Sequence, residues 1–146
     1  LAVGVYAVSA LLTFWLKDSR GQAEKENKVQ KIIFAAHCLL NTAAKVVLYE
    51  KEDMAAEETL RRRFLSKAVN CGIQLVQLPC PEFTLYGACR WGHVSDQFDN
   101  PFFRNHCREL LAPYLLQMKE YLAHPERFRL LGVVGVDGSP SCGVDY

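Results

Sequence analysis

Three short apolar segments, separated by two long helical patterns, constrain the fold of this chain more than any other feature. They cover residues 31–36, 73–78 and 129–136, and each has the length and apolar content of a buried strand. Between them, residues 53–70 and 101–123 follow helical spacing. Strands that alternate with helices pair in parallel through right-handed crossovers. The sequence therefore predicts an α/β fold, a Rossmann-like parallel sheet flanked by helices, and such a sheet is expected to continue beyond Tyr146.

Local signals mark where the predicted helices begin and end. Gly72 follows the first helix at the position of a C-cap glycine. Asn100 and Pro101 have the pattern of an N-cap residue and a first-turn proline for the second helix. Pro113 is expected to kink or split that helix, because proline has no backbone N–H to donate.

The first 28 residues differ from the rest of the chain. Residues 1–16 carry no charge and are nearly all apolar, whereas residues 17–28 are polar and mixed in charge. A membrane-spanning helix needs about 20 apolar residues, so this segment could belong to a membrane anchor or to a buried helix. The basic residues after it favour the cytoplasmic side. We therefore divide the chain into residues 1–28, an apolar segment with a polar linker, and residues 29–146, one α/β domain.

The charge balance argues against nucleic acid as a partner. Lys and Arg number 17 and Asp and Glu number 16, which gives a net charge of +1. Binding to phosphates needs clustered basic residues, and the one visible cluster is the triplet Arg61, Arg62 and Arg63. It lies in a helical pattern and is interpreted as a solvated helix face. The sequence leaves the oligomeric state open.

The chain has six cysteines, and three of them follow the predicted strands. The chain is too long for a small disulfide-stapled scaffold, which favours a reduced, cytoplasmic setting. Cys38, Cys80 and Cys142 come after the three strands, and the carboxyl ends of parallel strands meet at one edge of a sheet. Three thiolates without an evident fourth ligand would leave an open position, where metal enzymes bind substrate. The alternative is that these are cysteines at strand ends without a function.

The segments around these cysteines resemble a known family. They read Ala-His-Cys-Leu-Leu at 36–40, Leu-Pro-Cys-Pro-Glu at 78–82 and Gly-Val-Asp-Gly-Ser-Pro-Ser-Cys-Gly-Val at 135–144. Together they resemble the 2-thiouracil desulfurase family, formerly a domain of unknown function, and more closely its branch of desulfurase-related desulfidases. The likeness covers about residues 31–144. It implies a [4Fe-4S] cluster held by Cys38, Cys80 and Cys142, with the fourth iron binding the sulfur of a small thiolated substrate.

The first segment departs from the pattern of the better-known desulfurases. Their motif reads Ser-Ala-Cys-Leu-Leu-Gly, whereas here Ala36 and His37 precede the cysteine and Asn41 stands in place of the glycine. The substrate pocket, and with it the substrate, is therefore expected to differ.

Several polar residues lie beside the expected ligands. Glu82 could activate a water for attack on the carbon that bears sulfur, or it could cap local backbone. Ser141, like Ser139, could hydrogen-bond substrate or sulfide, or it could make a turn. His37 is expected to point away from Cys38, as neighbouring residues of a strand do, and so to be a packed or surface histidine rather than a ligand.

Cys71, Cys89 and Cys107 are not expected to bind the cluster. Cys71 at a helix end and Cys107 on a helix face should behave as small hydrophobic groups, whereas Cys89, in the loop after Cys80, stays an alternative candidate. In the loop after the second motif, Arg90 and His93 could line a pocket wall. Trp91, in the same loop, could stack on a flat heterocycle, but an aromatic lid over the core is the favoured interpretation.

Two functions follow from these observations. The first is a cluster-dependent desulfidase, a hydrolase or lyase that removes sulfur from a small thiolated compound. The second is a metal or iron–sulfur binding module without catalysis, with a redox-sensing role. Ferredoxin-type electron transfer is disfavoured because the chain lacks Cys-x₂-Cys runs. Nucleotide binding is disfavoured because neither the Gly-x-Gly-x-x-Gly nor the P-loop pattern is present.

Overall fold

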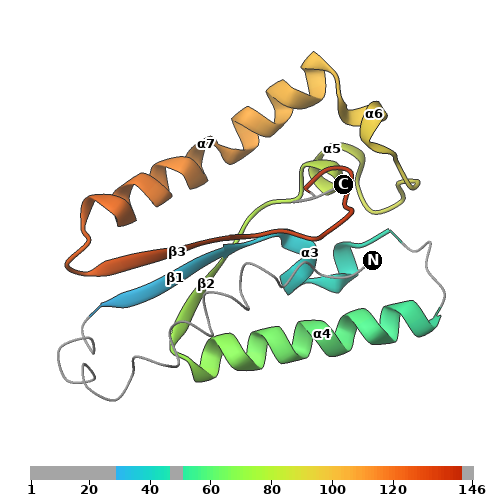
Figure 1. The fold of residues 1–146 in the computed structure, drawn as a ribbon. Helices are drawn as coiled ribbons and strands as arrows, with labels where there is room; N and C mark the ends of the chain where they lie inside the picture. The colour runs from blue at the N-terminus through green and yellow to red at the C-terminus, as the bar shows by residue number, and fades with distance from the viewer. Residues whose placement is uncertain (1–28, 47–50, 143–146) are drawn as a thin grey trace.

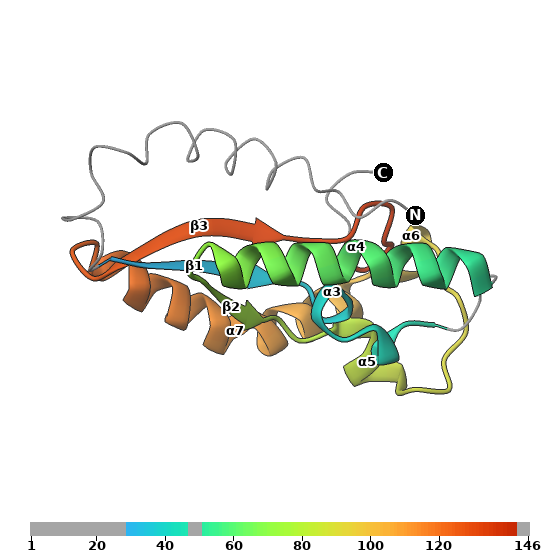
Figure 2. The same cartoon turned by 90° about the horizontal axis from the view of Figure 1, so that it is seen from below.

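A computed structural model of the chain describes residues 29–46 and 51–142. Three parallel strands, β1 (Gln30–Ala35), β2 (Ile73–Gln77) and β3 (Phe128–Val134), form a sheet in the order β2-β1-β3. One long helix covers each face of this sheet (Figure 1, Figure 2). This arrangement confirms the predicted α/β, Rossmann-like class. The helices are α3 (His37–Leu40), η1 (Thr42–Ala44), α4 (Lys51–Asn70), α5 (Pro81–Tyr86), α6 (Ser95–Phe98) and α7 (Pro101–Ala123).

The central strand β1 organises the sheet because it pairs on both sides. Its residue Phe34 lies opposite Val76 of β2 and Val133 of β3. The pairing with β3 is interrupted between Ile32 and Ile33, where β3 has an extra residue. The last four residues of β1 are buried, as expected for a strand covered on both faces. All three strands run in the same direction, so their carboxyl ends share one edge of the sheet.

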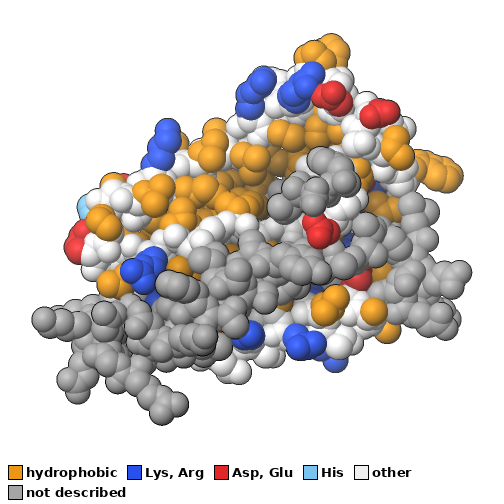
Figure 3. Space-filling model, viewed as in Figure 1, with side chains coloured by type: hydrophobic (Ala, Val, Ile, Leu, Met, Phe, Trp, Pro, Cys, Tyr) orange, Lys and Arg blue, Asp and Glu red, His pale blue; other side chains and the backbone are white. Residues whose placement is uncertain are grey.

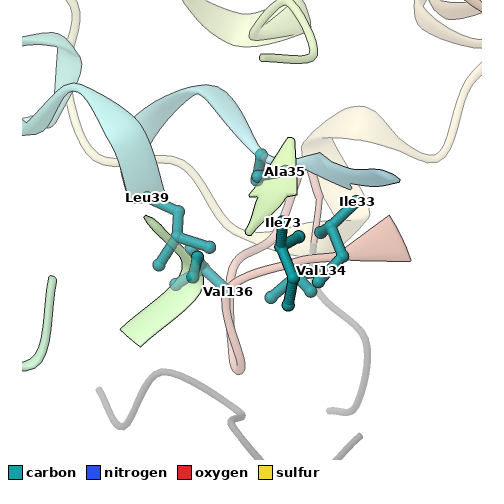
Figure 4. Packing of buried hydrophobic residues seen from close by; sticks show 8 residues of the cluster. Ile33, Ala35, Leu39, Ile73, Val134 and Val136 are labelled. Atoms are coloured by element: carbon teal, nitrogen blue, oxygen red, sulfur yellow. The ribbon is translucent and has the colours of Figure 1, made fainter. Parts of the chain in front are cut away.

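The face of the sheet under α4 holds the main hydrophobic cluster. Ile33, Ala35, Ile73 and Val134 contribute from the strands, and Ala68 contributes from α4. Figure 4 shows the strand residues converging with those of the segments that follow β1 and β3. Two of the cysteines expected as ligands pack against this cluster at its edge. The core therefore extends without a break to the carboxyl edge of the sheet.

The opposite face, under α7, is built from aromatic rings. Phe34 is completely buried, and its ring meets Tyr121 of α7 edge-on at 6.2 Å between centroids. Tyr121 in turn meets Phe128 at 5.0 Å. Such edge-to-face pairs are preferred by the ring quadrupoles. Farther along this face, Figure 3 shows hydrophobic side chains gathered along α7, where Leu115 and Leu116 are exposed.

The helix boundaries follow the local signals, with one exception. Gly72 has φ +66° and ends α4, a conformation that glycine adopts without a Cβ penalty. The side chain of Asn100 accepts a hydrogen bond from the Phe103 N–H at 2.9 Å and begins α7. The prediction that Pro113 splits this helix is wrong, because α7 is continuous from Pro101–Ala123 with the proline inside.

The interpretation of the arginine triplet is also wrong for its first member. Arg62 and Arg63 are exposed on α4, but Arg61 is half-buried. Its Nε and Nη2 atoms donate to the Leu40 carbonyl at 3.0 and 2.8 Å. This carbonyl ends the short helix α3, and Arg61 satisfies it from a helix more than 20 residues away in the chain. The arginine thus anchors the segment that carries Cys38.

Residues 1–28 lie outside the described part of the chain, and so does the expectation of an anchor at residues 1–16. Among residues 29–46 and 51–142, no helix combines the length and the apolar character needed to cross a membrane.

Candidate functional site

Backbone hydrogen bonds tie the three strand ends together at the carboxyl edge of the sheet. The Leu78 N–H donates to the Ala35 carbonyl at 2.7 Å, just past the end of β2. The Ala36 N–H donates to the Val134 carbonyl at 2.8 Å, just past the end of β1. The segments that leave this edge therefore start from neighbouring points. They carry the three cysteines singled out in the sequence, Cys38 on α3, Cys80 before α5 and Cys142 in the loop after β3.

Cys38 and Cys142 form a hydrogen-bonded thiol pair. The hydrogen bond from Cys38 lowers the pKa of Cys142 to about 6, with further help from Ser139, the Val136 N–H and Ser141 against the effect of burial. The same hydrogen bond raises the pKa of Cys38, and burial adds to this rise. The shared hydrogen bond therefore shifts the two thiol pKa values in opposite directions, downward for Cys142 and upward for Cys38. Ser139 Oγ lies 3.3 Å from the Cys142 sulfur.

Cys80 is the N-cap residue of α5 and is buried. Its sulfur accepts a hydrogen bond from the Phe83 N–H at 3.3 Å. Burial raises the pKa of the Cys80 thiol, and the nearby Cys142 raises it further. Pro81, in the first turn of α5, fits a helix start because its missing N–H would have no partner there. The convergence of the three cysteines, expected from the sheet topology, is thus present in the structure.

The donor set fits an iron–sulfur cluster in its chemistry. Thiolates are soft ligands that suit iron–sulfur clusters and zinc. Backbone N–H and hydroxyl groups already point at the sulfurs of Cys80 and Cys142, and such hydrogen bonds tune cluster stability and potential. No three His, Cys, Asp or Glu side chains in the described ranges are spaced to hold a single metal ion. A cubane cluster places each thiolate on a different iron, and so uses ligands that do not share one metal centre.

A buried lysine lies beside the thiol pair. Burial lowers the pKa of Lys45, whereas the charges of Cys38 and Cys142 oppose this shift. Its Nζ forms an ion pair with Glu57 of α4, and both side chains are almost fully buried. Lys45 follows η1, and nothing in its sequence context indicates a role near the cysteines. Lys45 therefore places a positive charge next to Cys38 and Cys142.

Glu82, the candidate base, is buried with only 7% of its surface exposed. Its Oε1 lies 3.1 Å from Arg90 Nε and 3.2 Å from His93 Nδ1. Its Oε2 accepts a hydrogen bond from Ser141 Oγ at 3.3 Å. The Arg90 Nε–H points away from the line to the carboxylate, so this contact is an ion pair without a hydrogen bond. Two candidate catalytic residues, Glu82 and Ser141, are therefore in direct contact.

Arg90 organises the loop between α5 and α6. Its Nη1 donates to the Gly87 carbonyl at 3.2 Å, and its Nη2 donates to the Ala44 carbonyl. Its guanidinium also lies 5.5 Å from the centre of the Phe83 ring. The sequence placed Arg90 on a pocket wall, but the structure places it at the junction of three segments. The signal in the sequence that could have indicated this role is Glu82, because a carboxylate that becomes buried requires a charged partner.

The structure agrees with the prediction for His37 in part and contradicts the prediction for Trp91. His37 is a packed histidine, as expected, but it begins α3 instead of extending β1. Its Nδ1 lies 2.8 Å from Gln77 Nε2, and its ring stacks on Phe83. The interpretation of Trp91 as a lid over the core is wrong, because the side chain is 80% exposed.

The other three cysteines differ from one another in their surroundings. Cys71 follows the end of α4 and packs against the core cluster. Cys107 lies on α7, where burial raises its pKa. Cys89 is exposed. In residues 29–46 and 51–142, none of these thiols is hydrogen-bonded to the three cysteines at the sheet edge.

Comparison with known proteins gives one informative relative. No protein-family model matches the chain. No solved structure matches it either. The chain is 31% identical over 117 residues to a Methanocaldococcus jannaschii protein named "Uncharacterized protein MJ0003", and the match covers 80% of this chain and 70% of the archaeal protein. This chain therefore belongs to the same protein family as that archaeal protein.

Proposed function

We propose that this protein is an iron–sulfur-dependent desulfidase, in which Cys38, Cys80 and Cys142 hold a [4Fe-4S] cluster with one open iron. One observation carries the proposal. The three cysteines come from the ends of three different strands and lie close enough to shift one another's pKa values. The resemblance of the same segments to the 2-thiouracil desulfurase family supports the identity of the cluster.

The reaction that suits this site is hydrolytic removal of sulfur from a thiocarbonyl compound. Water adds oxygen to the carbon, and sulfur leaves as hydrogen sulfide, so that C=S and H₂O become C=O and H₂S. No net electron transfer occurs, and no reductant is needed for turnover. When bound, the cluster supplies a soft Lewis acid that polarises the carbon–sulfur bond.

The protein's own residues supply orientation and proton transfer. Glu82 is positioned by Arg90 and His93 and takes the proton of the attacking water. Ser141 donates to the other oxygen of the same carboxylate and precedes a ligand cysteine, so it couples the base to the cluster loop. The shared hydrogen bond gives Ser141 a positioning role at the site in addition to any turn that it forms.

The experiment is anaerobic incubation of the cluster-loaded, full-length protein with thiolated heterocycles and thioamides. Released sulfide and the oxygen-containing product are measured together, with no reductant present. Glu82→Gln is expected to retain the cluster and lose most of the activity. Glu120→Gln, an exposed carboxylate on α7 that pairs with His124, is the matched control and should remain active. Full activity in Glu82→Gln would reduce Glu82 to a structural residue.

A second candidate function is a redox-sensing iron–sulfur or metal-binding module. The hydrogen-bonded pair of Cys38 and Cys142 favours it, because a thiol with a lowered pKa, such as Cys142, is more readily oxidised. The same incubations distinguish the two. A protein with an intact cluster that releases no sulfide from any compound in the panel would support the sensing module and contradict the desulfidase.

We further propose that the domain works in the cytoplasm, with residues 1–16 as a membrane anchor. The support is the sequence alone, through the uncharged apolar segment and the basic residues after it. The test is fractionation of cells that express the full-length chain. The anchor predicts recovery with membranes, and removal of the residues before Val29 should release the domain. Recovery of the intact chain in the soluble fraction without detergent would contradict it.

A further inference from the structure

A cavity of about 700 Å³ adjoins the cysteine loop on the side of α6 and α7. One wall is Pro140 and Ser141, from the loop after β3, and the other wall comes from α6 and the first half of α7. Figure 1 shows this loop turning toward the short helices α5 and α6 at the carboxyl edge of the sheet. The volume is in the range of pockets that bind small molecules.

Ser141 connects this cavity to the candidate site. It lines the cavity, it precedes Cys142 in the chain, and its hydroxyl donates to the buried carboxylate of Glu82. A molecule in the cavity is therefore within reach of the serine that contacts the candidate base. Phe98 and Phe103, whose ring centres lie 4.4 Å apart, form an apolar part of the same wall. Aromatic walls of this kind suit a flat ring.

Some charged residues of the cavity lining form an ion pair, and others have no partner within the described part of the chain. Arg104 forms an ion pair with Asp99, and each neutralises the other. Arg108 lies one turn further along α7, also in the lining, and within the described part of the chain no side chain is hydrogen-bonded or ion-paired with it. Arg108 is exposed, and it is the basic residue of the lining whose charge no carboxylate of the described residues offsets. An anion in the cavity would therefore find its opposite charge at Arg108.

We propose that the cavity binds the substrate and that Arg108 recognises a carboxylate on it. This inference rests on the proposed desulfidase function for the identity of the reacting group. The guanidinium presents paired N–H donors that match a carboxylate in a bidentate geometry. Asp96, on α6, also lines the cavity and is unpaired among the described residues. Its negative charge disfavours a second anionic group, so a singly charged carboxylate fits better than a doubly charged phosphate.

The substrate class is therefore a small, flat thiocarbonyl compound with one carboxylate. The ring packs against Phe98 and Phe103, and the carboxylate faces Arg108. Asp96, which also lines the cavity, could accept a hydrogen bond from a ring N–H, which thioamide-type heterocycles carry next to the C=S group.

The test compares two probes that differ only in the carboxylate, 2-thiouracil and 5-carboxy-2-thiouracil. Binding to the full-length protein is measured by calorimetry under anaerobic conditions, for the wild type, Arg108→Gln and Arg63→Gln. Arg63 is the matched control, because it is an exposed arginine on α4, outside the cavity. A charge-assisted hydrogen bond to an arginine predicts about tenfold tighter binding of the carboxylated probe. Arg108→Gln should abolish this preference, and Arg63→Gln should keep it.

Equal affinity of the two probes for the wild type, or a preference that survives in Arg108→Gln, would overturn the proposal. Weak binding of both probes, without a difference, would overturn it as well. Sulfide release is followed in the same samples, so that the two proposals can fail separately. A carboxylate preference without sulfide release would support the cavity and contradict the desulfidase. Sulfide release without a preference would do the opposite.

Discussion

Five of the six cysteines fall into two regions that differ in what surrounds the thiol, and the sixth, Cys89, is exposed. At the carboxyl edge of the sheet, Cys38, Cys80 and Cys142 lie among backbone N–H groups, serine hydroxyls and one another. On the helix side, Cys71 packs on the core cluster as a small apolar group, and Cys107 lies half-buried on α7. Both regions are partly buried, so burial alone does not separate them.

The parallel topology of the sheet, and not the number of cysteines, defines the candidate site. Parallel strands deliver their carboxyl ends to one place, and short segments after each strand then carry the thiols. A cysteine on a long helix has no such convergence. It occupies a position where a thiol, an alanine or a serine would be accommodated with a small change in stability.

The largest effect that this comparison predicts is on cluster content. Each of the substitutions Cys38→Ala, Cys80→Ala and Cys142→Ala should remove most of the iron and sulfide, because each removes one of the three proposed ligands. Cys71→Ala and Cys107→Ala should retain both at the wild-type level. Iron and acid-labile sulfide are measured after anaerobic purification. An iron-replete, brown Cys142→Ala protein would show that the cysteine after β3 is not a ligand.

The next effect concerns the sheet that brings the three segments together. Phe34 fills the aromatic face under α7 with no exposed surface. Phe34→Ala should lower the free energy of unfolding by about 3–5 kcal/mol. Phe102→Ala, on the first turn of α7 with 88% of the side chain exposed, should change it by less than about 0.5 kcal/mol. Urea unfolding of the cluster-free proteins measures both, and similar losses would mean that Phe34 does not lie in the core.

A smaller difference in folding stability is expected between loss of the buried ion pair at the site and loss of an exposed ion pair. Arg90→Met leaves the buried carboxylate of Glu82 without its arginine, and we expect a loss of about 3 kcal/mol. Arg104→Met removes the exposed pair with Asp99 and should cost less than about 1 kcal/mol. Thermal and urea unfolding of the two variants provide the comparison. If the losses are equal, the network around Glu82 is not a buried one.

The smallest effect is at the start of α7. Asn100→Ala removes the side-chain acceptor for the Phe103 N–H and should cost about 1 kcal/mol of stability. Asn105→Ala, on the exposed face of the same helix, leaves the cap intact and is the control. Iron content should not change in either variant. A change in cluster content with Asn100→Ala would tie α7 more closely to the cysteine edge than the contacts indicate.

The regular part of the fold could be predicted from the sequence. The three strands and both long helices were predicted within a few residues of their positions, because each has a continuous hydrophobic pattern. The helices also have clear boundary signals, Gly72 at the end of α4 and Asn100 at the start of α7. Proline at position 113 misled the prediction for α7. The split is wrong because α7 stays continuous through Pro113, and the sequence pattern does not report the packing on the sheet that can support such a helix.

The short helices and the polar network could not be predicted in the same way. Helices of four to six residues, such as α3 and α5, are not stable by propensity and depend on contacts from elsewhere. For α3 that contact is Arg61 on α4, and for the α5 loop it is Arg90. Each joins residues that are far apart in the chain. The convergence of the cysteines was predictable because it needs only the strand order, whereas the partners of Glu82 need the full course of the loop.

The proposed cluster on Cys38, Cys80 and Cys142 can be tested on the full-length wild-type protein, purified without oxygen and without added metal. We expect a brown protein that contains iron and acid-labile sulfide in equal amounts, with no zinc. A colourless protein that contains zinc, or a protein that takes up no iron and sulfide on reconstitution, would contradict it.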